Sequence, residues 1–406
     1  MRRISLIPKL CVTLMFLNLY VFTVVFKTTI PYCTQLTTVM ALAFVLFGSI
    51  RNGKLFVRAY KGLYPTIGYF LFIFITGCVL SLSNNYDISN TFSLFEMILL
   101  GIIVCFICWC DKSYEFVYLL CILVAVIDAV YAVVTAQGFN VRLRLANNVS
   151  ENTAGLIFLM GILSSYLTKN KLLNPYIKLI INIVLIIAIV LTGSRQALLQ
   201  STIVYFYWFM PQIKNFFSTK IRVKQIVFFA VLVCLCIAFI NSTLALDLLD
   251  SKLVERLFGE NTATHTSDAI RFKLYYIGID LMLSSPLYGN GYKNNPYTHS
   301  TYMEVLGGSG LLGFIIFFLP LFIRIKKIFD GMRVVSLKED KWNLRSKLLC
   351  MVLLFVMMFF RAYHYYMPSF VLMILGMTDF AYGQGPKSTQ DEYSSSVRNF
   401  NVKVAK

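Results

Sequence analysis

The sequence predicts an all-helical protein that crosses a membrane many times. Of its 406 residues, 58% are hydrophobic and 14% are charged, and the mean hydropathy is +0.71. A soluble protein of this length could not cover so much apolar surface with polar groups. About twelve apolar stretches are long enough to cross roughly 30 Å of hydrocarbon as helices, and they define the predicted architecture.

The predicted spans follow one another along the chain. They cover approximately residues 10–26, 33–50, 63–82, 92–110, 114–136, 152–168, 175–193, 195–210, 223–243, 300–323, 346–360 and 367–383. The basic N-terminal segment is interpreted as part of a first helix rather than a cleaved signal, because no small-residue cleavage site is evident. The very short connection between residues 175–193 and 195–210 must lie near the surface or inside the protein, since bare backbone is unstable in lipid.

The distribution of Lys and Arg predicts the orientation of the spans. With a cytoplasmic N-terminus, 27 of the 37 basic residues fall in inner segments and 10 in outer ones. This asymmetry follows the positive-inside rule, places both termini in the cytoplasm and explains the net charge of +18 without nucleic acid. The predicted parts are nine spans in 1–243, a large outer loop at 244–299, three spans in 300–383 and a cytoplasmic tail at 384–406.

The outer loop contains a predicted helix. In "TSDAIRFKLYYIGIDLML" the apolar residues recur at helical spacing, and Ser267 or Asp268 is available as N-cap. The Pro, Gly and Asn residues of "SSPLYGNGYKNNPYTH" then break this helix. A loop of this length is usually functional rather than a mere connector.

Arginines are few in the outer segments, so each one needs a reason. Arg195 lies between two spans, where it either snorkels to the head groups or anchors a phosphate. Gly193 and Ser194 would let an anion approach the backbone, and a helix N-terminus would follow. Arg271 lies in the first turn of the loop helix, where the helix dipole disfavours a cation; it is either solvated or functional.

Four further residues are candidates for contact with a substrate. Arg142 and Arg144 alternate in "FNVRLRLAN" and therefore face one way in an extended segment, toward either an anionic head group or solvent. Arg361 and His364 lie close together in "FRAYHYYMP". No set of His, Cys and carboxylate residues has the spacing of metal ligands, so we expect no metal.

His299 stands at the start of a predicted span and has two readings. It either caps the span structurally or acts as a general base, because a neutral imidazole can take a proton from a hydroxyl near physiological pH. His265, in a polar Thr and Ser run, is interpreted as solvated.

Three stretches resemble motifs of the O-antigen ligase/polymerase superfamily. "LTGSRQALL" resembles its Ser-Arg motif, and "AIRFKLYYIGIDLMLSSPLYGNGY" resembles its segment with an arginine, an amphipathic helix and a Pro-Leu-x-Gly-x-Gly turn. "THSTYMEVLGGSGLLG" resembles its His-Asn-x-Tyr-Leu-Glu…Gly-Leu-Leu-Gly signature. Together they cover about a third of the chain, roughly residues 185–315. Ser300 stands where the family commonly has Asn, and it can still cap the following helix.

The resemblance implies a metal-independent, inverting glycosyltransferase with a membrane-embedded, all-helical fold of the C type (GT-C) and no cofactor. Its substrates would be oligosaccharides on undecaprenyl diphosphate, at the outer face of a bacterial cytoplasmic membrane. Arg195 and Arg271 would bind diphosphate, and His299 would be the base acting on the acceptor hydroxyl. Tyr275 and Tyr302 are candidate sugar contacts, because flat amphipathic rings suit sugar faces. Membrane lipids are expected partners, and a chain-length regulator is a candidate partner.

The shared motifs leave alternative functions open. A polymerase joins repeat units, whereas a ligase moves the finished chain to another acceptor; polymerase is favoured because polymerases are the more widely occurring members. A flippase for lipid-linked oligosaccharides would have a similar number of spans, but usually shows an inverted repeat and midplane ionisable residues. Here Asp128 and Glu96 are the clear mid-span acids, and no repeat is visible. A sugar-binding sensor without catalysis is a further alternative.

Overall fold

Helices make up most of the part of the chain that the structure describes. The computed structural model describes residues 5–28, 30–52, 61–84, 89–136, 151–218, 262–291, 298–335, 338–360 and 367–378. Across these ranges most residues lie in helices and none in a strand, which confirms the predicted all-helical class.

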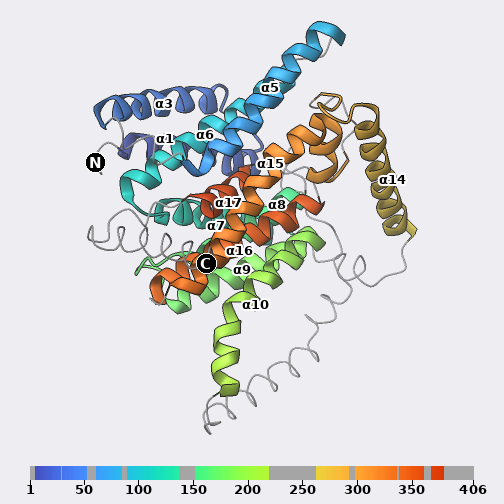
Figure 1. The fold of residues 1–406 in the computed structure, drawn as a ribbon. Helices are drawn as coiled ribbons and strands as arrows, with labels where there is room; N and C mark the ends of the chain where they lie inside the picture. Colours follow the sequence, from blue (N-terminus) through green and yellow to red (C-terminus); the bar gives the residue numbers. More distant parts are fainter. Residues whose placement is uncertain are drawn as a thin grey trace, which may run out of the picture.

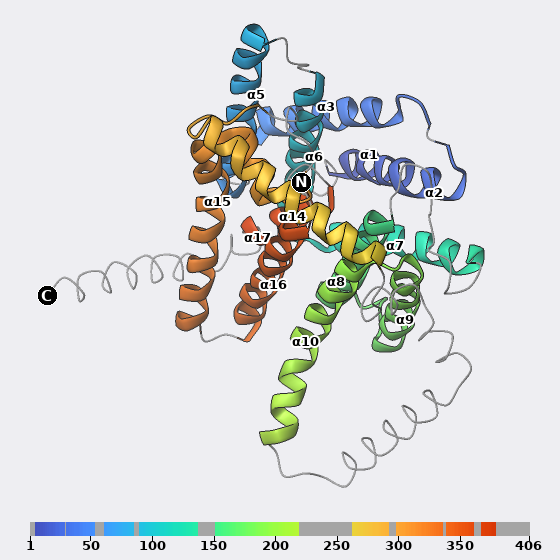
Figure 2. The same ribbon diagram turned by 90° about the vertical axis from the view of Figure 1, so that its right-hand side faces the viewer.

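The helices form a bundle from which the ends of α5 and α10 project, and α14 lies along one side of it (Figures 1 and 2). In chain order they are α1 (Leu6–Phe16), η1 (Leu17–Phe22), α2 (Thr23–Val25), α3 (Cys33–Asn52), η2 (Lys61–Leu63), α5 (Tyr64–Asn84), α6 (Ser89–Asp111), α7 (Glu115–Thr135), α8 (Glu151–Leu167), α9 (Pro175–Thr192), α10 (Arg195–Ser218), α14 (Thr262–Ser284), α15 (Thr301–Val334), α16 (Lys338–Phe360) and α17 (Met367–Met377).

Several of these helices can cross a membrane. Among the described residues, five are long and apolar enough by length and composition: Leu6–Val25, Glu115–Thr135, Pro175–Thr192, Thr301–Val334 and Asp340–Phe360. They support a multi-pass membrane protein. Shorter apolar helices at Cys33–Gly48, Tyr64–Val79 and Leu99–Asp111 coincide with three more predicted spans. The predicted span at 223–243 lies outside the described residues, and the total of twelve stays a prediction.

Some helices extend well beyond the spans predicted for them. α10 continues to Ser218 and α15 to Val334, while α16 already begins at Lys338. The predicted limits lie where apolar sequence gives way to polar or charged residues. Helical hydrogen bonding has no such requirement, because charged residues such as Lys and Glu are good helix formers.

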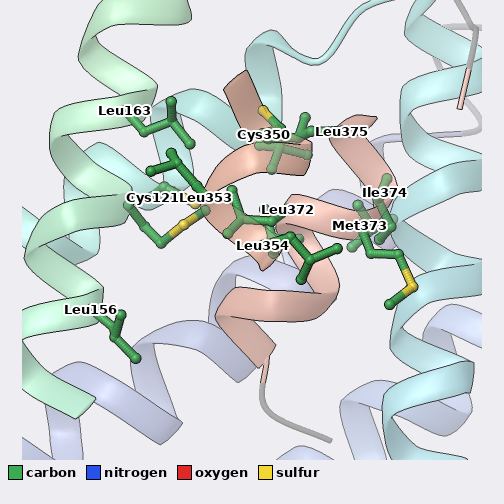
Figure 3. Packing of buried hydrophobic residues seen from close by; sticks show 14 of the residues in the cluster. Cys121, Leu156, Leu163, Cys350, Leu353, Leu354, Leu372, Met373, Ile374 and Leu375 are labelled. Atoms are coloured by element: carbon green, nitrogen blue, oxygen red, sulfur yellow. The ribbon is translucent and has the colours of Figure 1, made fainter. Parts of the chain in front are cut away.

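Small residues allow close packing in the centre of the bundle. A Cβ atom at Gly161 of α8 would lie 2.5 Å from Cβ of Ala125 on α7 and 2.9 Å from Cδ1 of Leu185 on α9. The three helices therefore approach closely at this point. Fully buried Leu353 of α16 and Leu372 of α17 lie in the adjoining cluster (Figure 3).

The short connection between α9 and α10 is buried inside the protein. This is one of the two positions that the sequence predicted for it, the other being the membrane surface. Gly193 closes α9 in the left-handed conformation (φ 61°), and its N–H donates to the Val190 carbonyl at 2.9 Å. Thr192 and Ser194 on either side have no exposed surface. The surrounding helices thus shield this turn from lipid.

Helix α14 corresponds to the predicted loop helix, but it begins earlier. It starts at Thr262, so neither Ser267 nor Asp268 is its N-cap. For the same reason Arg271 lies in the interior of the helix, and its predicted position in the first turn is wrong. The apolar spacing located the helix correctly, whereas the polar residues before it also adopt helical backbone. The predicted outer-loop and domain boundaries remain predictions.

Helix α15 reverses direction, contrary to the single span predicted at 300–323. Gly310 has non-helical angles (φ 62°, ψ −166°), which divide α15 into a short helix before it and a long helix after it. The rings of Tyr302 and Phe318 stack with centroids 4.9 Å apart. In an unbroken helix these residues would be about 24 Å apart along the axis. The short helix therefore folds back along the long one.

Candidate active site

Three helices meet around the C-terminal end of α16. The carbonyl of Leu353 accepts from Gln200 Nε2 of α10 at 3.2 Å, and that of Phe355 accepts from Tyr302 Oη of α15 at 3.2 Å. The carbonyl of Phe359 accepts from Tyr275 Oη of α14 at 3.2 Å. Six residues of α-helix span about 9 Å, so parts of α10, α14 and α15 surround one short segment of α16.

Arg195 lies near the level of this segment. Two hydrogen bonds join α10 to α16. Tyr207 Oη donates to the Arg345 carbonyl at 3.1 Å, and Gln200 Nε2 donates to the Leu353 carbonyl. Residue numbers therefore fall along α10 as they rise along α16, and the two helices are antiparallel. Arg195, five residues before Gln200, falls beside the last turns of α16.

The backbone at Arg195 is held firmly. Ser194 precedes α10 as its cap, and its Oγ accepts from the Ala197 N–H at 3.4 Å. A Cβ atom at Gly155 of α8 would lie 2.8 Å from Cβ of Ala197 and 2.9 Å from Cβ of Ser194. Because Gly155 has no side chain, α8 packs closely against this buried turn. Helix α10 begins at Arg195, as the sequence predicted.

Arg271 lies on the face of α14 that contacts α15 and α16. Arg271, Tyr275 and Gly278 are spaced by four and three residues, so they share one side of the helix. Tyr275 reaches the Phe359 carbonyl, and a Cβ atom at Gly278 would lie 2.9 Å from Cβ of Met303. Arg271 therefore lies on this side of α14, one turn before Tyr275 in the sequence.

His299 has a left-handed backbone conformation, with φ 58°. For a residue other than glycine such a conformation costs of order 1–3 kcal/mol and needs support from its surroundings. Buried Thr298 supplies it, because its N–H donates to Glu304 Oε1 at 3.3 Å and its Oγ1 donates to the Ser300 carbonyl at 3.1 Å. Ser300 occupies the N-cap position of α15, but its side chain makes no capping hydrogen bond.

The reversal of α15 directs His299 toward α16. Because the short helix runs back along the long one, its N-terminus lies beside Phe318 and not at the outer limit of a straight span. The ring of Tyr302, three residues after His299, also lies 5.2 Å from that of Phe359. Regions carrying Arg195, Arg271 and His299 thus converge on the last turns of α16.

A backbone clasp holds the reversal in place; we use this name for residues 286–291 and 307–312. An unbroken helix would join the N–H groups of Leu311 and Leu312 to the carbonyls of Gly307 and Gly308. The clasp exchanges these bonds for four others: Asn290 N–H to Gly307 O (3.0 Å), Gly291 N–H to Gly308 O (3.0 Å), Leu311 N–H to Pro286 O (2.8 Å) and Leu312 N–H to Leu287 O (3.2 Å). These bonds satisfy two carbonyls and two N–H groups that the break removes from the helical ladder, and unsatisfied backbone groups are costly in a membrane protein.

Two glycines make the clasp sterically feasible. Gly289 (φ 73°) and Gly310 (φ 62°) both adopt the left-handed region. A Cβ atom at Gly289 would lie 2.4 Å from the carbonyl carbon of Gly308, and one at Gly310 would lie 2.5 Å from the Leu287 oxygen. The glycines of the two resembling motifs therefore contact each other directly.

The remaining candidates have different outcomes. Tyr275 and Tyr302 lie at the end of α16, where their hydroxyls bond to carbonyls of that helix. Their contact with sugars stays a prediction. The other four candidates lie outside the described residues: Arg142, Arg144, Arg361 and His364.

Sequence reasoning gave no role to two residues that build the site. Glu304 anchors the turn before His299, and the Thr-His-Ser-Thr-Tyr-Met-Glu order, with a carboxylate shortly after a potential cap, was an available signal. Gln200 ties α10 to α16 from a fully buried position. A glutamine in an apolar stretch was its only signal.

Part of the chain matches a known protein family. Residues 180–318 match the family model described as O-antigen ligase. No curated protein matches the chain. The matched segment contains all three resembling stretches together with Arg195, Arg271 and His299. Over this segment the chain is similar to the O-antigen ligases, which confirms the predicted resemblance to the O-antigen ligase/polymerase superfamily.

Proposed function

We propose that the protein is a polymerase of lipid-linked oligosaccharide repeat units. In this proposal about twelve spans form a GT-C-type glycosyltransferase in a bacterial cytoplasmic membrane, with both termini in the cytoplasm. The substrates are undecaprenyl-diphosphate-linked repeat units, and the product is an O-antigen, capsular or exopolysaccharide chain. The observation that supports the proposal is that the helices and the turn carrying Arg195, Arg271 and His299 meet at the end of α16, within the matched segment.

The reaction uses these residues as follows. Arg195 and Arg271 bind the diphosphate of the donor and stabilise the charge that develops on it, without a metal. An acceptor hydroxyl attacks the anomeric carbon from the opposite side and inverts it. A bond from that carbon to the acceptor oxygen forms, and the bond to the diphosphate oxygen breaks. The acceptor proton passes to His299, and the lipid diphosphate leaves.

The rigid support of His299 suits a general base. Both substrates are lipid-anchored, so their diphosphates stay at head-group height while their sugars project outward. A base has to be held at a constant position relative to the diphosphate anchors. The Thr298–Glu304 hydrogen bond and the clasp are the elements that provide this support in the proposal.

A ligase is the second candidate, because the matched family model carries that description. Both enzymes would use the same lipid-diphosphate donor and the same three residues. They differ in the acceptor: a second repeat unit for the polymerase and a different molecule for the ligase.

Purified protein with a synthetic lipid-diphosphate repeat unit as its sole substrate tests the function. The wild type should form polymer, also in the presence of a chelator. His299→Ala should reduce the rate by about 10²–10⁴-fold, the usual effect of losing a general base. His265→Ala is the control and should retain activity.

Each failure has its own meaning. Polymer formation by His299→Ala at near wild-type rate would remove the base assignment. Inhibition of the wild type by chelator would refute the metal-free mechanism. Transfer that occurs only after a second, non-identical acceptor is added would identify the protein as a ligase.

A further inference from the structure

A second site is formed at the opposite end of the bundle. A cavity of about 240 Å³ lies between the turn that joins α6 to α7, the end of α8, the first half of α16 and the end of α17. Along α16 its residue Lys347 is twelve positions before Phe359, which corresponds to about 18 Å. The cavity is therefore separate from the candidate active site, although both use the same helix.

The cavity wall carries more positive than negative charge. Three lysines line it, Lys112, Lys169 and Lys347, against one carboxylate, Glu115. Glu115 ties α7 to the end of α8: its oxygens accept from Thr168 Oγ1 at 2.5 Å and from the Lys169 backbone N–H at 2.8 Å.

The three lysines of the cavity differ in their exposure. Lys112 and Lys169 are exposed, whereas the side chain of Lys347 is only 5% exposed. Burying an ammonium group is unfavourable unless anionic or polar groups surround it. An anion inside the cavity would add such a group. Trp342 and Tyr118 line the same cavity and limit its width with apolar rings.

The surroundings of the cavity are tied together, so its shape does not depend on one helix alone. Tyr114 Oη donates to the Thr378 carbonyl at 2.7 Å, which joins the start of α7 to the end of α17. Asp111, which directly precedes Lys112 in the sequence, forms an ion pair with Lys9 of α1 at 2.5 Å. Both oxygens of this carboxylate have partners in the N-terminal segment, because Asp111 Oδ1 also accepts from Ser5 Oγ at 3.2 Å.

We propose that this cavity binds a phosphate-bearing anion, carried by an anionic phospholipid of the inner leaflet or by a small soluble phosphate ester. Its volume is below the roughly 300–1,000 Å³ of pockets for drug-sized ligands, which suits a head group better than a sugar chain. Lysine is a good phosphate ligand as a point charge. Basic pockets between helices on the cytoplasmic side recognise lipid head groups, and the charge asymmetry predicts that this end is cytoplasmic.

Bound anion would connect α6, α7, α8 and α16 at the end remote from catalysis. Because α16 also supplies the carbonyls that hold Gln200, Tyr302 and Tyr275, the anion would stabilise the helix on which the candidate active site is assembled. The proposed anion site does not depend on the proposed polymerase function, because its test measures binding and not polymer formation.

Native mass spectrometry of the purified full-length protein provides the test. The probes are phosphatidylglycerol, the zwitterionic lipid phosphatidylcholine, glycerol 3-phosphate and inorganic phosphate. The double variant Lys112→Gln/Lys169→Gln removes the two exposed lysines of the cavity and keeps the buried Lys347. Lys326→Gln/Lys327→Gln, at exposed positions on α15, removes the same charge elsewhere and is the matched control.

We expect phosphatidylglycerol to bind in preference to phosphatidylcholine, and the cavity variant to bind it about 30-fold more weakly while the control binds normally. If glycerol 3-phosphate or inorganic phosphate binds with the same dependence on Lys112 and Lys169, and phosphatidylglycerol does not bind, the ligand is a small soluble phosphate ester. Equal binding of every anion by the cavity variant and the wild type, or no binding at all, would overturn the proposal. Lys347→Met, which keeps most of the side-chain volume, should weaken the binding of the same ligand.

Discussion

His299 has two properties that substitutions can separate, its imidazole and its left-handed backbone. Glycine adopts positive φ freely, whereas other residues lose roughly 1–2 kcal/mol there. We therefore expect His299→Gly to have a Tm at or above that of the wild type and still lose about 10²–10⁴-fold in polymer formation. Calorimetry and the polymer assay together measure both effects. A Gly variant with full activity would show that the backbone, and not the imidazole, matters.

The two arginines call for substitutions that retain charge. Removing one donor to a developing anion typically reduces the rate by roughly 10²–10³-fold, which we expect for Arg195→Ala and Arg271→Ala. The corresponding Lys variants should recover only part of this loss, because a point charge does not replace a bidentate fork. Arg333→Lys, on an exposed surface at the other end of α15, is the control. Full activity of both Arg271 variants would exclude this residue from the site.

At the scale of elements, the clasp makes a prediction about stability. Gly310→Ala would place Cβ 2.5 Å from the Leu287 oxygen in a left-handed conformation, so the clasp must open. We expect a loss of at least about 2 kcal/mol in the free energy of unfolding, and reduced activity because His299 loses its support. Thermal unfolding measures the stability.

Gly68 offers a matched control for that substitution. It lies inside α5, and no atom lies within 4 Å of a Cβ built there. Ala is preferred over Gly in helices by roughly 0.5–1 kcal/mol, so Gly68→Ala should leave stability unchanged or raise it. If both variants behave alike, close backbone contact at Gly310 is not what holds the reversal.

Most elements could be predicted from local sequence, whereas the ends of several of them could not. The apolar run at 175–193 corresponds to α9, and the spacing of Ile270, Leu274 and Ile277 located α14. The start of α14 at Thr262 was missed, because a polar segment adopts helical backbone without any apolar stripe to reveal it. Periodicity reports which face is buried, and it is silent where no face is buried.

At the scale of the whole molecule, the arrangement of loops tests the predicted orientation. The start of α7 contacts the ends of α8 and α17, whereas the end of α16 lies with α14 and the start of α10. In a cysteine-free background, we expect Ser267→Cys to react with a membrane-impermeant reagent in intact cells. Lys171→Cys, between α8 and α9, should react only after the cells are opened. The reverse pattern would refute the orientation and the proposed site with it.

The sequence by itself determined the membrane class, the helical content, the place of most helices and the three motifs, because each depends on composition or on neighbours within a few turns. Only the tertiary structure decided that α15 reverses at Gly310. A run such as "GGSGLLG" is compatible with a straight, closely packed helix, and the break becomes stable only when residues 286–291 supply the missing hydrogen bonds. The same holds for the site: Arg195, Arg271 and His299 are about a hundred residues apart in the chain at their extremes, and backbone carbonyls of α16, which no side-chain pattern encodes, bring their helices together.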